Sequence, residues 1–151
     1  MMISASHLKK AVAGRRVLID SNIIIYLTDS VNPYQKLAKL LFQMVEAGDA
    51  EAVISILSVG EVMQGPINQN QHALALEVKD YLVNFPNCRC QDITLGVLER
   101  VGSDRTIEWK GLRSVDSLII ASGLVNGADQ FISNDRHFLK AISKPMMLSF
   151  D

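Results

Sequence analysis

Four acidic residues stand where an apolar segment ends or where a helix is expected to begin. They are Asp20 after Val17–Ile19, Glu61 in SILSVGEV, Asp116 in SVDSLIIAS and Asp135 in FISND. Asp20 is the least expected, because a second apolar segment, IIIYL, follows it closely. An unpaired carboxylate in such surroundings costs several kcal/mol, so Asp20 must reach water or a hydrogen-bonding or cationic partner.

A divalent cation would be such a partner. Carboxylates that converge raise one another's pKa, and a cation relieves this repulsion. Mg²⁺ and Mn²⁺ prefer oxygen ligands, and Mg²⁺ combines carboxylates with waters and substrate phosphate. A cation held in this way can activate water and stabilise charge on a phosphoryl group. The four acids therefore predict a metal-dependent site, provided that the fold brings them together.

Each acid taken alone also has a purely structural explanation. Ser58 and Glu61 match the S-x-x-E capping box, in which the glutamate bonds back to the start of its helix. Asp116 falls in the first turn of an expected helix, where the helix dipole favours an acid. Asp20 and Asp135 could each cap the helix that follows. Capping predicts scattered carboxylates, whereas a metal site predicts that they converge.

The elements that must position the acids alternate between short β-branched segments and helical patterns. This alternation predicts an α/β domain with a mostly parallel sheet and helices on both faces. In such sheets ligands bind outside the carboxyl ends of the strands, so the four acids are expected at one edge. The expected strands are 16–20, 51–56, 88–93, 129–133 and 146–150, and the expected helices are 33–48, 58–65, 71–85, 94–103, 114–127 and 134–142.

The composition is that of one soluble globular domain. A chain of 151 residues, 48% hydrophobic and 21% charged, can bury a real core. No apolar segment approaches the ~20 residues that span a bilayer, and the N-terminus lacks the apolar stretch of a signal peptide. We therefore expect a cytoplasmic protein with no membrane association. The net charge of −1 gives no overall attraction for nucleic acid, so any such binding needs a local patch.

The chain begins with a basic N-terminal extension, residues 1–16, ahead of a single domain in residues 17–151. We expect the extension to be a solvated segment, and an arm that contacts phosphate is the alternative. Its cations, which no acid accompanies, are Lys9, Lys10, Arg15 and Arg16.

Two other sequence features argue against a cysteine metal site and against nucleotide binding. Cys88 and Cys90 form a C-x-C pair in an expected strand, with no second pair or histidine nearby to complete a metal site. Two small buried hydrophobic residues are the favoured interpretation. The chain also lacks G-x-x-x-x-G-K-S/T and G-x-G-x-x-G, which argues against a nucleotide-binding protein.

The segments LIDSNIIIYL, SILSVGEVMQG and VDSLIIASGLVNGADQFISNDRHF resemble the conserved blocks of the PIN domain, in particular those of VapC-type toxins. The resemblance runs from about Val17 to Phe150. It implies a PIN-like α/β/α sandwich around a central, mostly parallel sheet. It also implies a metal-dependent endoribonuclease, a hydrolase of RNA phosphodiester bonds, acting as the toxin of a toxin–antitoxin pair. A cognate antitoxin and a homodimer are the implied protein partners.

The resemblance also implies roles for individual residues. Asn22 and Ser133 would orient the carboxylates around the ion. Ser133 stands where threonine is usual in the family, and both residues carry a hydroxyl. Four acids are implied to bind Mg²⁺ or Mn²⁺ and to act in catalysis, with the last completing the site or serving a second ion: Asp20, Glu61, Asp116 and Asp135.

Binding of RNA, with tRNA as one candidate substrate, needs cations near these acids. Trp109 could stack on a base, but packing against the protein is the favoured interpretation. Three cations flank the acids and are candidate RNA contacts, with an ordinary solvated surface as the alternative: Lys110, Arg113 and Arg136. The alternative function is a non-catalytic PIN-like binding or scaffold module, in which the acids only cap helices.

Overall fold

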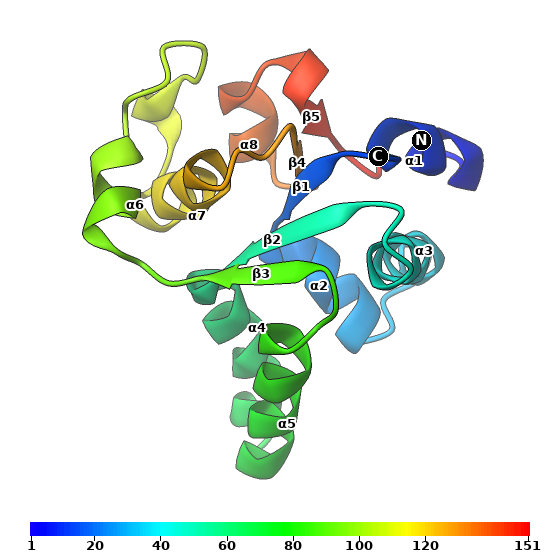
Figure 1. Ribbon diagram of the computed structural model, residues 1–151. Helices are drawn as coiled ribbons and strands as arrows, with labels where there is room; N and C mark the ends of the chain where they lie inside the picture. Colours follow the sequence, from blue (N-terminus) through cyan, green and yellow to red (C-terminus); the bar gives the residue numbers. More distant parts are fainter.

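The structure is a computed structural model that describes residues 1–151. Its centre is a five-stranded sheet in the order β3-β2-β1-β4-β5, in which every neighbouring pair is parallel. Helices cover both faces of the sheet (Figure 1), so the predicted α/β/α sandwich is confirmed. The strands are β1 (Arg16–Ile19), β2 (Glu51–Ser55), β3 (Cys88–Gln91), β4 (Gln130–Ile132) and β5 (Met147–Leu148).

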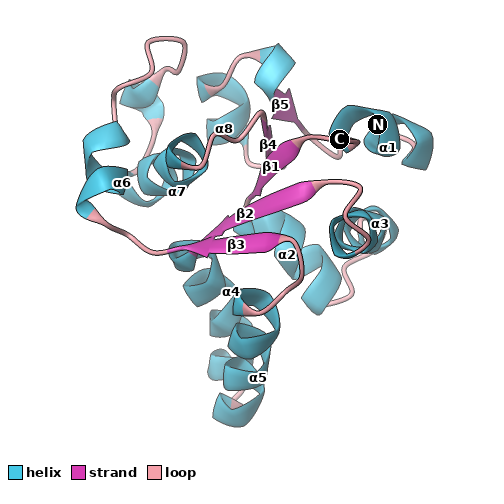
Figure 2. Cartoon of the chain, in the orientation of Figure 1, coloured by secondary structure: helices cyan, strands magenta, loops and turns pink.

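The chain also contains eight α-helices and two short 3₁₀ helices. Figure 2 shows how the helices and strands are arranged along the chain. No helix is long and apolar enough to cross a membrane. In chain order the helices are α1 (Ala5–Val12), α2 (Ser21–Thr28), α3 (Gln35–Glu46), α4 (Ile56–Asn68), α5 (His72–Val83), α6 (Leu95–Arg100), η1 (Trp109–Gly111), α7 (Ser114–Val125), α8 (Arg136–Ala141) and η2 (Lys144–Met146).

The sheet separates two hydrophobic cores because successive side chains of a strand point to opposite faces. In β1, Val17 and Ile19 belong to the larger core, which includes residues of α1 to α5. Leu18 lies between them in sequence and belongs to the smaller core, which includes residues of α7 and α8. All three side chains are fully buried. The continuous apolar run that predicted β1 is thus explained by burial on both faces.

Helix α7 lies unusually close to the sheet at Gly123. A Cβ atom built at this position would lie 2.7 Å from Cε2 of Phe131 and 3.0 Å from Cγ of Leu18. Any larger residue would push the helix away from β1 and β4. Because α7 carries Asp116 at its start, this contact also fixes the position of a candidate site residue.

The N-terminal segment is solvated only in part, because most of its residues are exposed while one face of α1 packs on the rest of the protein. The expectation of a wholly solvated extension therefore needs correction. Leu8 and Val12 of α1 are fully buried and belong to the larger core. The backbone N–H of Ile3 donates to the carbonyl of Phe150 at 2.8 Å, which joins the two ends of the chain. The helical spacing of Leu8 and Val12 was the available signal for this packing.

Other expectations about the elements need correction. Helix α2 was not among the expected helices, because IIIYL taken alone is equally typical of a strand. Helix α4 begins at Ile56 and ends at Asn68, so it neither starts at Ser58 nor stops at Gly65. Pro66 lies in the final turn of α4, where little helix remains for it to interrupt.

The two cysteines pack as the sequence analysis favoured. Cys88 and Cys90 are free thiols, each half-buried on the edge strand β3, and both contact the larger core. Burial raises the pKa of the Cys88 thiol to about 12, and the neighbouring Cys90 adds to the rise. A thiol of this kind is inert and behaves as a small apolar side chain.

Candidate active site

The candidate site lies where the strand order reverses. From β1 the chain continues to β2 and β3 on one side, whereas β4 and β5 lie on the other side. Asp20 directly follows β1, and Ser133 directly follows the adjacent strand β4. The backbone N–H of Asp20 donates to the carbonyl of Ile132 at 3.0 Å and extends the pairing of these strands. The carboxyl edge at such a reversal is where open α/β sheets bind ligands.

Asp20 is held by three hydrogen bonds. Its Oδ1 accepts from the backbone N–H of Ser21 at 2.8 Å, which caps α2. Its Oδ2 accepts from Ser133 Oγ at 2.7 Å and from Asn22 Nδ2 at 3.0 Å. Asn22 Nδ2 also lies 3.1 Å from Ser133 Oγ, so the three side chains form a closed network. Both carboxylate oxygens of Asp20 therefore have the hydrogen-bonding partners that its burial requires.

These partners do not fully offset the burial of Asp20, whose relative exposure is 4%. Burial is the main cause that raises the pKa of Asp20 to about 6 from 3.8, while Ser133 and the backbone of Ser21 oppose the rise. The charges of Glu61 and Asp135 raise the pKa further. Asp20 is therefore ionised at neutral pH only at a cost in folding free energy, and a cation that joins the site would lower this cost.

Asp135 also acts as a helix cap. Its Oδ1 accepts from the backbone N–H of His137 at 2.7 Å and lies 3.0 Å from the ring Nδ1 of the same residue. The backbone N–H of Asp135 donates to Ser133 Oγ at 3.0 Å. One hydroxyl therefore links Asp20 to the backbone that carries Asp135. Asp20 and Asp135 each cap a helix, and they are also close enough for the charge of Asp135 to act on Asp20. A capping role therefore does not exclude a shared site for these two acids.

Glu61 lies in the second turn of α4 and is exposed. The alternative interpretation of Ser58 and Glu61 as a capping box is wrong, because Ser55 caps the helix and accepts from the N–H of Leu57 at 3.2 Å. Ser58 is buried, and its hydroxyl has no hydrogen-bond partner. Glu61 does not directly follow a strand, yet its charge acts on both Asp20 and Arg113. Its carboxylate is therefore near the site without a capping role.

Asp116 differs from the other acids because it forms a salt bridge with an arginine. Arg113 Nε donates to Asp116 Oδ2 at 3.1 Å, and Arg113 Nη2 donates to Oδ1 at 3.2 Å. The backbone N–H of Arg113 also donates to Oδ2 at 3.3 Å. The Asp116 side chain is 4% exposed, whereas that of Arg113 is 67% exposed. The sequence analysis placed Arg113 among the RNA contacts and missed this pair, although their i, i+3 spacing was a signal.

The chemistry of these side chains fits a hard divalent cation. Carboxylate oxygens are the ligands that Mg²⁺ and Mn²⁺ prefer, and the charges of Glu61 and Asp135 that add to the raised pKa of Asp20 are ones that a cation would offset. The four carboxylates do not form a preassembled centre, since no three His, Cys, Asp or Glu side chains lie in an arrangement that could hold a metal ion.

Asn134 is a further residue of the site that the sequence analysis did not assign. Its backbone N–H donates to Asn22 Oδ1 at 3.1 Å. Its side-chain Oδ1 accepts from the backbone N–H of Phe150 at 2.8 Å and from Ser149 Oγ at 2.9 Å. Asn134 thus ties the C-terminal residues to the loop that carries Ser133.

The remaining cations of the region are exposed, and Trp109 is packed. Lys110 and Arg136 have no acidic partner in the structure, so both are available to solvent. Trp109 is half-buried against the smaller core and donates from Nε1 to the carbonyl of Asp104 at 2.9 Å. The favoured interpretation of Trp109 as a packing residue is confirmed.

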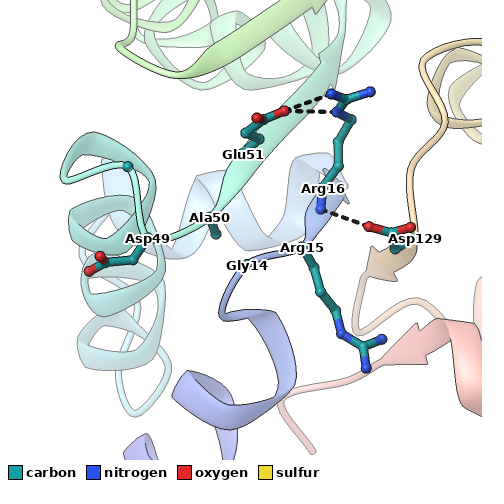
Figure 3. A pocket seen from close by; sticks show the side chains of 8 residues that line it. Gly14, Arg15, Arg16, Asp49, Ala50, Glu51 and Asp129 are labelled. Carbon is teal, nitrogen blue, oxygen red and sulfur yellow. Dashed lines mark hydrogen bonds and ion pairs between the residues drawn. The ribbon is translucent and has the colours of Figure 1, made fainter.

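A separate polar cavity of about 200 Å³ lies at the opposite edge of the sheet, as Figure 3 shows. Arg16, at the start of β1, binds Glu51 Oε2 through Nε at 2.9 Å and through Nη2 at 2.8 Å. Its backbone N–H donates to Asp129 Oδ2 at 3.1 Å. These bonds tie the starts of three strands together. Arg16 and Asp20 are four residue steps apart along the strand, a distance of about 13 Å, so Arg16 does not reach the acidic site.

The chain belongs to the PIN domain family, whose sequence model matches residues 17–144. No curated protein sequence matches the chain. The fold is also that of solved toxins. A toxin–antitoxin complex from Klebsiella pneumoniae contains a chain 22% identical to this one, with a TM-score of 0.60, and the match covers 87% of this chain and 95% of that chain.

Two further structures are similar over comparable lengths. VapBC2 from Rickettsia felis, bound to a DNA fragment from its promoter, has 18% identity and a TM-score of 0.62, with 90% of this chain and 99% of that chain covered. VapC20 from Mycobacterium tuberculosis, a toxin that cleaves the sarcin–ricin loop, has 15% identity and a TM-score of 0.60, with 82% and 93% covered. At these identities the likeness establishes the fold.

Proposed function

We propose that this protein is a metal-dependent endoribonuclease, with Asp20 at the centre of its active site. The observation that carries the proposal is the placement of a buried carboxylate at the strand-order reversal, with Glu61 and Asp135 close enough to raise its pKa. In a non-catalytic scaffold protein, repulsion among these carboxylates would destabilise the fold without a functional benefit. Asp116 is the fourth proposed ligand once it leaves Arg113.

In this proposal the chain's own side chains position the reacting groups. A bound Mg²⁺ or Mn²⁺ would supply Lewis-acid activation of water and stabilise the charge that develops on the phosphoryl group. Ser133 and Asn22 hold the Asp20 carboxylate in one orientation, so little reorganisation is needed when the ion binds. The exposed side chains of Lys110 and Arg136 are proposed to contact the RNA backbone.

The proposed domain is residues 17–151, with residues 1–16 as an addition that packs on it through Leu8 and Val12. We also propose that it is cytoplasmic and the toxin of a toxin–antitoxin pair, since the R. felis neighbour is a VapBC complex. Apolar side chains on α4 and α5 support a protein partner, because three of them are about 40% exposed: Ile67, Leu74 and Leu76. Light scattering of the purified chain, of 16.7 kDa, tests the homodimer directly.

Incubation of the purified protein with total RNA and with tRNA tests the activity. We expect cleavage with Mn²⁺ or Mg²⁺, none with EDTA, and none by Asp20→Asn. Asp49→Asn is the matched control, because Asp49 is exposed at the opposite edge of the sheet and should leave cleavage unchanged. Equal cleavage by the wild type and Asp20→Asn would reject the proposed site, and metal-independent cleavage would reject the mechanism.

A further inference from the structure

Arg113 is the only lysine or arginine that forms a salt bridge with one of the four acids. Its guanidinium presents two parallel N–H groups to the two oxygens of Asp116. Such forked, charge-assisted pairs are stronger and more specific in geometry than single hydrogen bonds. Asp116 is therefore not free to bind a cation while this pair persists.

The side chains of Arg113 and Asp116 differ in their freedom to move, because only that of Arg113 is largely exposed. The Asp116 side chain is buried in the first turn of α7, whereas the Arg113 side chain precedes the helix and is largely exposed. Arg113 can rotate into water at little cost, because its stem is flexible and its head is already partly solvated. Asp116 cannot follow, so opening the pair leaves a buried carboxylate that needs another cation.

Arg113 also interacts electrostatically with Asp135 and Glu61. The hydrogen bonds and charge of Asp116 raise the pKa of Arg113 above its usual range, and Asp135 and Glu61 contribute further. The guanidinium therefore lies within the combined field of three acids. This is the position in which positive charge relieves their mutual repulsion.

We propose that Arg113 is a built-in counter-ion that competes with the divalent cation for Asp116. In the metal-free protein Arg113 holds Asp116, and the incoming ion must displace it before Asp116 can bind. The salt bridge thereby sets the concentration of metal at which the site fills. This inference rests on the proposed function, because it assumes that the ion binds at these acids.

Direct titration with Mn²⁺, followed by calorimetry or by the electron paramagnetic resonance signal of the free ion, tests the competition without reference to RNA cleavage. We expect Arg113→Gln to bind Mn²⁺ about tenfold more tightly than the wild type, a change within the range of about 5–150-fold that is typical of coupling between two sites. Arg136→Gln is the matched control, since it removes the same charge beside Asp135 from a side chain without an acidic partner. Arg113→Gln binding no more tightly than Arg136→Gln would overturn the proposal.

Arg113→Lys provides a second test in case Arg113→Gln, in which Asp116 loses its charged partner, does not fold. Lysine keeps the charge but cannot form the forked pair, so this variant should bind Mn²⁺ severalfold more tightly than the wild type. In a protein that also carries Asp116→Asn, Arg113→Lys should leave the Mn²⁺ affinity unchanged. If Arg113→Lys raises the affinity as much in that protein as in the wild type, the proposed role of Asp116 is overturned. Wild-type binding that survives Asp20→Asn rejects the proposed metal site itself. If Mn²⁺ binding requires Asp20 but its affinity does not change when Arg113 is replaced, only the proposed role of Arg113 as counter-ion is rejected.

Discussion

Replacing Asp20 with asparagine should change the stability of the metal-free protein in opposite directions at low and at neutral pH. The pKa of Asp20 is raised from 3.8 to about 6, so the folded state binds the proton more tightly than the unfolded chain does. The resulting stability is fully present below about pH 4 and is lost as the pH rises through about 6. The total loss corresponds to about 3 kcal/mol.

Asp20→Asn removes this loss but disturbs the hydrogen bonds of the site. The amide NH₂ must face either the N–H of Ser21 or the donors of Asn22 and Ser133, which costs about 1–2 kcal/mol. In EDTA at pH 7.5 we therefore expect Asp20→Asn to be more stable than the wild type by about 1–2 kcal/mol. At pH 4 the variant should be less stable by a similar amount.

Urea unfolding of both proteins in EDTA across this pH range measures the difference. Asp49→Asn is the control, and its difference from the wild type should not change sign, since Asp49 is exposed and its side chain makes no hydrogen bond. An Asp20→Asn protein that is less stable than the wild type at every pH would refute the reasoning. In that case Asp20 would be a structural helix cap whose charge the fold tolerates.

Three further predictions concern the network, the packing and the N-terminus. Ser133→Ala should lower the free energy of unfolding by about 1–3 kcal/mol in urea, because two buried partners lose one bridging hydroxyl. Gly123→Ala should cost about 1–3 kcal/mol by calorimetry, since the new Cβ would overlap Phe131, and a stability equal to wild type would show that α7 can shift freely. Leu8→Ala should cost about 2–5 kcal/mol, whereas the exposed Lys9→Ala should stay within about 0.5 kcal/mol; equal effects would contradict the packing of α1.

Much of the fold was predictable because its signals are local. The β-branched run before Asp20 and the apolar pattern ending at Gly127 each specify an element through burial and turn geometry. Gly127 has a φ of +67°, which glycine adopts at no steric cost after α7. Helix α2 was missed because a short apolar run does not distinguish a buried strand from a buried helix.

The site was predictable in its residues but not in its contacts. The bonds from Asn22 and Ser133 to Asp20 agree with the orienting role inferred from the resemblance, and the catalytic roles stay predictions. The pairing of Arg113 with Asp116 depends on rotamers at the start of α7, which sequence spacing permits but does not require. The burial of α1 depends on long-range packing against α3, which the helical spacing of Leu8 and Val12 permits but does not require.

The chemistry of the RNA ends tests the central claim most directly. Water that attacks phosphorus leaves linear phosphate ends, whereas attack by the ribose 2′-hydroxyl leaves 2′,3′-cyclic phosphate. We predict that the wild type with Mn²⁺ produces only linear ends, and that Asp20→Asn produces none above background. Cyclic phosphate ends, or linear ends formed equally by Asp20→Asn, would contradict a hydrolytic site built on the acids at the carboxyl edge of the sheet.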